Sequence, residues 1–234
     1  MKRLIWFLLI CMPLFAQNEF QKGEKQFLAG NYLQAQSLLE SAISKSPDNA
    51  KALEYLGDIH CLNSKWEQAL PYYEKLKSIA PNQANYFYKY GGVLGMIAKE
   101  SNKFKALSLI GDIRESFEKA ISLDKSHVEA RWALIELYLQ LPAIVGGSES
   151  KAEKYASQLV AISPVDGYLA KGYIAEYFNR YKTAETNYKK AISIGQSKLT
   201  YEKLANLYRN KMNQPQKAAM VLADYKKIAS TNNS

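Results

Sequence analysis

The residues that most often carry out chemistry are few and scattered in this chain of 234 residues. His60 and His127 lie far apart and lack companions at metal-ligand spacing. Glu129 and Glu136 are seven residues apart on one face of a predicted helix, but solvated pairs of acids have the same spacing. The sequence shows no nucleophile–histidine–acid pattern and no glycine-rich phosphate loop. We therefore predict a protein that is not an enzyme and that holds no metal and no cofactor.

The first sixteen residues have the composition of a secretory signal peptide. Two basic residues precede an apolar run that continues to Ala16, and the segment contains no acid. The run is shorter than the roughly 20 residues of a spanning helix. We predict cleavage between Ala16 and Gln17, export to the periplasm or cell envelope, and no transmembrane span in the mature chain. Cys11 would permit a lipoprotein, but the bulky Ile10 before it argues against lipidation.

Charge and cysteine content narrow the classes of partner. The net charge is +9 at pH 7, and the lysines are spread along the chain as on solvated helix faces. For an exported protein we predict no nucleic-acid partner, whereas an anionic ligand or an envelope surface stays open. Cys61 is the one cysteine beyond the signal peptide, so no internal disulfide can form. We expect Cys61 to be half-buried in a helix and the chain to be a monomer.

A repeated pattern organises the chain. A small residue is followed by a bulky one four residues later, by another apolar residue at seven and, in three of the six repeats, by proline at twelve. The pattern recurs at intervals of 34, 44, 39, 32 and 34 residues. Its first three positions share one helix face, and proline ends the helix. Because an earlier helix precedes each of these, we predict six helix pairs that bury a core by stacking. The units cover residues 17–47, 50–81, 84–125, 128–164, 167–196 and 199–230.

Two units are longer than the others. The 44-residue unit has an insertion within residues 96–113, where the apolar spacing stays helical, so longer helices are expected rather than a loop. The 39-residue unit adds a break that contains Pro142, Gly146, Gly147 and Ser148. Either this break is a shaped connector whose glycines allow a turn before a capped helix, or its amide groups bind an anion at the helix start.

The segment at residues 52–81, "ALEYLGDIHCLNSKWEQALPYYEKLKSIAP", resembles the tetratricopeptide repeat (TPR). It has leucine and glycine in the first helix, alanine and tyrosine in the second, and a closing proline. The resemblance implies an all-α fold, a right-handed superhelical solenoid, and a single repeat domain over residues 17–234. A narrower resemblance is to exported bacterial TPR proteins with a P-x-I-x-GGS loop. A distant one is to the TPR subunit associated with TRAP-type transporters.

The resemblance also implies where a partner binds. In TPR proteins the first helix of each unit lines a concave groove, usually with its residues 2, 5, 9 and 12. This register predicts an inner surface of acids, aromatic side chains and glycine: Glu54, Asp58, Tyr88, Gly92, Glu129, Trp132, Glu136, Tyr168 and Lys171.

Two functions fit this surface. The first is a scaffold that binds a protein or peptide along the groove, because aromatic anchors with polar neighbours suit such partners. The second is a small-ligand component serving a transporter. It would need a closed cavity around Tyr88, Trp132 and the glycine-rich helix at Gly91, Gly92 and Gly95, with residues 142–148 at the mouth.

Overall fold

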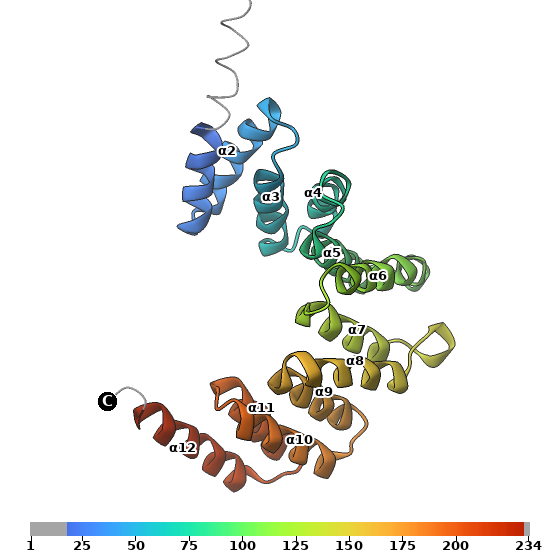
Figure 1. Cartoon of the computed structure of the whole chain (residues 1–234), viewed down its shortest axis with the longest axis vertical. Coiled ribbons are helices and arrows are strands. Elements are labelled where there is room, and N and C mark those ends of the chain that lie inside the picture. Colours follow the sequence, from blue (N-terminus) through green and yellow to red (C-terminus); the bar gives the residue numbers. More distant parts are fainter. Residues whose placement is uncertain (1–17, 232–234) are drawn as a thin grey trace, which may run out of the picture. The chain divides into compact units, whose positions relative to one another are not determined.

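Figure 1 shows the computed structural model, which describes residues 18–231. The predicted signal peptide and its cleavage site lie outside the described residues. The described chain is a succession of helices joined by short connections, with no strand among residues 18–231. The described part divides into two compact units, residues 18–125 and residues 126–231. The predicted single repeat domain stays a prediction.

Unit 1 contains three helix pairs. A helix over residues 18–28 precedes α2 (Tyr32–Lys45). The second pair is α3 (Ala50–Leu62) and α4 (Trp66–Ile79). The third is α5 (Ala84–Glu100) and α6 (Lys103–Leu123), which are longer than the others, as the helical spacing of the insertion predicts. Of all helix pairs in the described chain, α5 and α6 share the most extensive contact.

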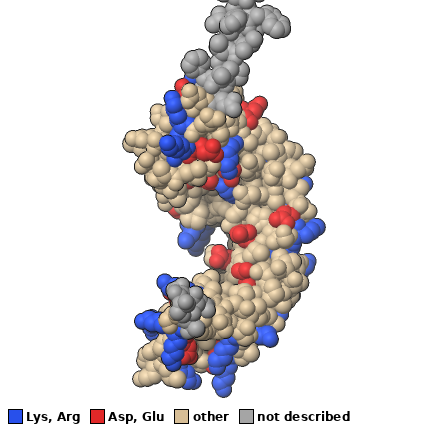
Figure 2. All heavy atoms as spheres, turned by 60° about the vertical axis from the view of Figure 1, so that its left-hand side comes forward, with Lys and Arg blue, Asp and Glu red and all other residues tan. Residues whose placement is uncertain are grey.

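Unit 2 also contains three pairs. The first is α7 (Val128–Gln140) and α8 (Glu149–Ile162), with the short 3₁₀ helix η1 (Ala143–Val145) between them. The second is α9 (Pro164–Tyr177) and α10 (Tyr181–Ile194). The third is α11 (Lys198–Asn210) and α12 (Pro215–Thr231). The face drawn in Figure 2 shows lysine and arginine side chains scattered over the surface, in agreement with their spread along the sequence.

The second helices bury the stripe that the repeat pattern predicts. In α4 the buried residues are Ala69, Tyr73 and Leu76. In α2, α8 and α10 the buried residues also stand at the predicted positions 0, 4 and 7 of the repeat. The small first residue allows close approach of the neighbouring helix, and the bulky residues fill the space beside it. The prediction of an all-α fold built from helix pairs is confirmed.

The first helices form the inner layer of each unit. In unit 2, α9 contacts both α7 and α11, whereas α8, α10 and α12 contact mainly the first helices. In unit 1, Tyr55 Oη on α3 donates a hydrogen bond to Glu24 Oε1 on the preceding first helix (2.9 Å). Side chains on the exposed face of one first helix therefore meet those of the next.

Five of the six connections within helix pairs contain one residue in the left-handed region. In four of them this residue is Gly30, Ser64, Asn179 or Asn213, with φ between 52° and 79°. Glycine and asparagine adopt this conformation at low cost and commonly end helices. The α7–α8 connection instead carries Gly146 after η1, and α5–α6 has no such residue; these are the two units that are longer than the others.

Candidate functional site

In unit 1 two predicted groove residues belong to a closed ionic cluster. Lys89 Nζ on α5 lies 2.8 Å from Glu54 Oε1 and 2.7 Å from Asp58 Oδ1 on α3. Tyr73 Oη on α4 donates to the same Asp58 oxygen at 2.6 Å. Lys51 Nζ adds a longer contact of 3.1 Å to the other oxygen of Glu54. The two carboxylates on the inner face of α3 are thus neutralised within the protein.

The cluster is partly removed from water. Burial opposes the charge of Glu54, but the hydrogen bonds and charges of Lys89 and Lys51 outweigh burial and hold the pKa of Glu54 below its ordinary value. Burial likewise opposes the charge of Lys89, while Asp58 and Glu54 raise the pKa of this lysine. Both residues stay charged near neutral pH. Neither pKa moves toward neutrality, so this cluster is suited to stabilising the fold and not to transferring protons.

Cys61 contacts Tyr73 of this cluster, and its neighbour His60 packs on Tyr72. Cys61 is half-buried, as predicted, with Sγ 3.7 Å from Tyr73 Oη, and burial raises the pKa of its thiol. A raised pKa disfavours the reactive thiolate. His60 is buried and its ring stacks on Tyr72. His127 is also buried, and its Nδ1 accepts a hydrogen bond from the Ala130 amide at the start of α7 (3.3 Å).

The glycines of α5 divide into two kinds. A Cβ on Gly91 would lie 3.0 Å from the Phe117 ring, so this glycine permits close packing of α5 on α6. A Cβ on Gly92 or Gly95 would meet nothing within 4 Å. Tyr88 is half-buried, with its ring centroid 5.9 Å from that of Phe117. The Tyr88 ring therefore lies toward α6. At Gly92 no neighbouring side chain covers the helix surface.

In unit 2 the predicted groove residues of α7 meet α9. Trp132 is half-buried, and its Nε1 donates to Asp166 Oδ1 at 3.3 Å. Its ring centroid lies 6.2 Å from that of Tyr173. Glu136 is exposed, and burial followed by the negative charge of Glu136 raises the pKa of Tyr173. Aromatic and acidic side chains of two first helices therefore form one surface.

The acids on this surface have no counterpart of Lys89, which neutralises the two carboxylates of α3 in unit 1. Glu136 forms no ion pair with any described residue. Glu176 accepts a hydrogen bond from Tyr188 Oη (2.9 Å) but likewise has no lysine or arginine at ion-pair distance in the described chain. Asp166 accepts from Trp132 and from Ser163 Oγ. Glu129 is exposed, and its oxygen lies 3.2 Å from His127 Nδ1. We call Trp132, Glu136, Asp166, Tyr173 and Glu176 the acidic–aromatic face.

With Gly172 matched to Gly57, the predicted register at Tyr168 and Lys171 is two residues later than the inner positions of α9. Tyr168 packs against the hydrophobic core cluster of unit 2, and Lys171 is half-buried. The shift arises because Pro164 is the first residue of α9 as well as the closing proline of the preceding unit. Asp166, Tyr173 and Glu176, which the sequence register missed, occupy the face instead. A spacing in the sequence would have given the correct register of α9. Gly57 and Tyr73 are sixteen residues apart, as are Gly172 and Tyr188, and each tyrosine packs on its glycine.

The loop at residues 142–148 is a fixed connector. Gly146 has φ +103°, and a Cβ on Gly147 would lie 1.8 Å from the Leu141 carbonyl oxygen. The amides of residues 145–148 all donate to backbone carbonyls, the last of them to Tyr138 at 3.0 Å. Ser148 Oγ caps α8 by accepting from the Lys151 amide. The amides of residues 145–148 are therefore occupied, and an anion at this loop would have to bind the first amides of α8.

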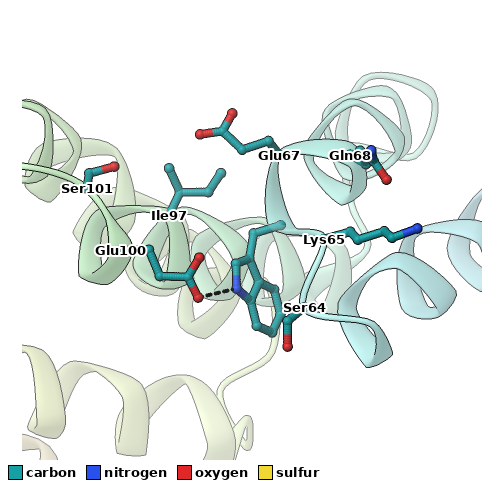
Figure 3. A pocket seen from close by; sticks show the side chains of 8 residues that line it. Ser64, Lys65, Glu67, Gln68, Ile97, Glu100 and Ser101 are labelled. Atoms are coloured by element: carbon teal, nitrogen blue, oxygen red, sulfur yellow. Dashed lines mark hydrogen bonds between the residues drawn. The ribbon is translucent and has the colours of Figure 1, made fainter.

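Two surface pockets lie at the turns between the helices of a pair. One, of about 310 Å³, is lined by Lys65, Glu67, Gln68, Ile97 and Glu100 among others, which Figure 3 shows. Trp66 Nε1, in the lining of the same pocket, donates to Glu100 Oε1 at 2.7 Å. The other, of about 550 Å³, lies between the α9–α10 and α11–α12 turns. Neither includes Tyr88 or Trp132.

Among residues 18–231, no group of three or more histidine, cysteine or acidic side chains could hold a metal ion. Within the same range, no helix combines the length and apolarity that crossing a membrane would require.

Comparisons with known proteins place these features in context. Residues 20–84 match the family model described as tetratricopeptide repeat. Over 131 residues the chain is 27% identical to tetratricopeptide repeat protein 37 of Xenopus laevis; the match covers 54% of this chain but spans only 8% of that protein.

Solved structures share the fold. A TPR protein from Parabacteroides merdae superposes with a TM-score of 0.67 at 18% identity, covering 92% of this chain and 80% of its own. PilW, titled a widely conserved type IV pilus biogenesis factor, gives a TM-score of 0.65 at 17% identity, with 91% and 92% covered. A thermophilic TPR protein from Thermus thermophilus gives 0.61 at 17% identity, with 89% and 99% covered.

Proposed function

Because residues 20–84 are tetratricopeptide repeats and the described chain has the TPR fold, we propose that this protein is a non-enzymatic scaffold whose inner helix faces bind a segment of a partner protein. Rigid helix pairs hold the binding side chains in place, so little conformational entropy is lost on binding.

The observation that carries the proposal is the unneutralised charge on the acidic–aromatic face. Glu136 and Glu176 stand near Tyr173 without a cation. A basic segment would supply that cation, and a lysine or arginine side chain can also lie on the Trp132 or Tyr173 ring. In unit 1 the corresponding carboxylates already have Lys89. We therefore propose that unit 2 binds a basic, extended segment through this face.

A direct test uses the tryptophan in the face as its own reporter. With Trp66→Phe, Trp132 is the remaining tryptophan beyond the predicted signal peptide. Its fluorescence is followed while an alternating Lys/Leu peptide is titrated into the mature chain. We expect saturable binding that weakens as salt rises, because the attraction between the charges is screened.

Substitutions locate the binding surface. Glu136→Gln with Glu176→Gln is expected to weaken binding about tenfold, since two close charge pairs are lost. Glu153→Gln on α8 is the matched control, because Glu153 is an acid of the same unit on a second helix. Equal effects of the control and the test pair would refute the proposal, as would equal binding of an alternating Glu/Leu peptide by this face.

For location, we propose the cell envelope, on the strength of the predicted signal peptide. Fractionation of the host cells with an antibody against the mature chain tests this, and recovery with the cytosolic fraction would contradict it. The small-ligand alternative gains no support from the two pockets, since both are shallow and lie at turns away from Tyr88 and Trp132.

A further inference from the structure

A second surface of unit 2 lies at the edge where its helix pairs turn. It comprises the 142–148 loop, the α9–α10 turn and the α11–α12 turn. The first residue of α8 after this loop, Glu149, forms an ion pair with Arg180 in the α9–α10 turn, and the 550 Å³ pocket lies between the second and the third. We call Ile144, Phe178, Arg180, Lys182, Lys211 and Met212 the basic turn edge.

Apolar side chains project from this edge. Ile144, in the middle of η1, is 94% exposed. Tyr177 and Phe178 are also exposed and pack edge to face on each other. The hydrogen bonds of the 142–148 loop fix the backbone that carries Ile144. A partner can therefore bury these side chains without first ordering the loop.

The pocket on this edge is positively charged. Arg180, Lys182 and Lys211 line it, and no acid does. Arg180 is paired with Glu149 and lies over the Phe178 ring. Lys182 and Lys211 form no ion pair with any described residue. Two lysines thus flank a concave surface with their charges uncompensated by the protein.

The corresponding pocket of unit 1 shows that the repeat does not require this charge. Ser64 and Asn179 are the left-handed turn residues of the two pockets, and the residues that follow them line each pocket in the same order. In unit 1 the residue matching Lys182 is Glu67, which pairs with Lys105 at 2.7 Å. The pocket of unit 1 is thus mixed in charge and crossed by the Trp66–Glu100 hydrogen bond, whereas that of unit 2 is basic.

We propose that the basic turn edge binds an acidic segment of a partner protein, with carboxylates at Lys182 and Lys211 and an apolar side chain against Ile144, Phe178 or Met212. The two unpaired lysines complement carboxylates in charge, and the exposed apolar side chains of the same edge complement apolar residues of such a segment. This edge is opposite in charge to the acidic–aromatic face of the same unit, so one unit can hold two segments of opposite charge at once.

Three labelled peptides of equal length test the edge by fluorescence anisotropy against the full mature chain: alternating Glu/Leu, alternating Glu/Ser and alternating Lys/Leu. We expect the Glu/Leu peptide to bind, the Glu/Ser peptide to bind about fivefold more weakly because the apolar contact is missing, and Lys182→Glu with Lys211→Glu to weaken Glu/Leu binding at least about tenfold. Ile144→Ser is expected to weaken it about threefold.

Matched variants separate this edge from the rest of the protein. Lys190→Glu lies on α10 away from the pocket and is expected to change Glu/Leu binding less than about twofold. Glu136→Gln with Glu176→Gln should weaken binding of the Lys/Leu peptide and leave Glu/Leu binding unchanged. The proposals for the two surfaces can therefore be contradicted separately. Absence of Glu/Leu binding at low salt, or equal loss with Lys190→Glu, overturns the proposal. So does binding of vesicles of anionic phospholipid that depends on Lys182 and Lys211 when the peptide does not bind.

Discussion

The inner faces of the two units use matching helix positions in opposite ways. In α3, Glu54 and Asp58 flank Gly57, and Lys89, two residues before Gly91 of α5, binds both acids. In α7 the matching positions hold Trp132 and Glu136. In α9 the residue two before Gly172 is Ala170, which is fully buried.

A position on the inner face therefore does not by itself provide a binding surface. The glycine–tyrosine packing that sets the register is the same in both units, at Gly57–Tyr73 and Gly172–Tyr188. What differs is the side chain that the next first helix brings to the acids. A lysine there neutralises the acids internally, whereas an alanine leaves their charge available to a partner.

The substitution with the greatest predicted loss of stability lies in the 142–148 loop of unit 2. Gly147→Ala should destabilise unit 2 by about 3 kcal/mol or more, because its Cβ would overlap the Leu141 carbonyl oxygen. Gly111→Ala in α6 of unit 1 is the control: its Cβ would meet nothing within 4 Å, and a gain of up to about 1 kcal/mol is expected. Urea unfolding followed by Trp132 in a Trp66→Phe background measures Gly147→Ala in unit 2, and unfolding followed by Trp66 in a Trp132→Phe background measures Gly111→Ala in unit 1. Equal stabilities of Gly147→Ala and its parent would show that the loop is free to adjust.

Next in size is removal of the cation from unit 1. Lys89→Met should cost about 2–3 kcal/mol at pH 7, because two partly buried carboxylates lose their partner. Lys51→Met, whose side chain is 51% exposed, should cost less than about 0.5 kcal/mol. Chemical unfolding followed by Trp66 in a Trp132→Phe background measures both. Equal losses would contradict the closed cluster.

The pH dependence of the same variant has a definite sign. The pKa of Glu54 is held below its ordinary value of 4.5 in the folded protein. The stabilisation by the ion pair is therefore present above about pH 4.5 and is lost as pH falls and the carboxylate is protonated. The stability difference between the parent protein and Lys89→Met should shrink as pH decreases from 7 toward 3. A difference that stays constant over this range would mean that Lys89 acts through packing alone.

The same substitution should have opposite effects in the two units. Glu54→Gln is expected to cost about 1–2 kcal/mol, because a charged hydrogen bond to Lys89 is weakened at a buried site. Glu136→Gln should be neutral or stabilising by less than about 0.5 kcal/mol, because it removes an unpaired charge near Tyr173. Thermal unfolding of both variants measures the sign. A loss of stability with Glu136→Gln would indicate a cation partner within the chain.

The glycines of α5 are expected to differ from each other in the sign of their effect. Gly92→Ala should stabilise unit 1 by about 0.5–1 kcal/mol, because helix propensity improves and the Cβ meets no neighbour. Gly91→Ala should instead be destabilising, since its Cβ would press on Phe117 and Ser116. The two variants differ by one residue in position and serve as controls for each other in the same unfolding measurement.

The sequence was informative wherever a local pattern decides the structure. The buried stripe of the second helices and the longer α5 and α6 follow from apolar spacing, so they could be predicted. The inner face of α9 could not be placed by counting from proline, because Pro164 both ends one unit and begins the next helix. Lys89 was missed because its role depends on α3, which is distant in sequence. The hydrogen bonds of the loop amides could not be predicted either, because they depend on where the Tyr138 carbonyl lies.

The long hairpin of α5 and α6 has a consequence for how the chain folds. Its helices are joined by a two-residue connection and share the most extensive contact of the described chain, so their contacts are close in sequence and form at a low entropic cost. In stacked repeats the most stable element can nucleate its neighbours. Amide hydrogen exchange in the native protein should therefore be slowest in this hairpin, and folding should spread outward from it rather than from either terminus.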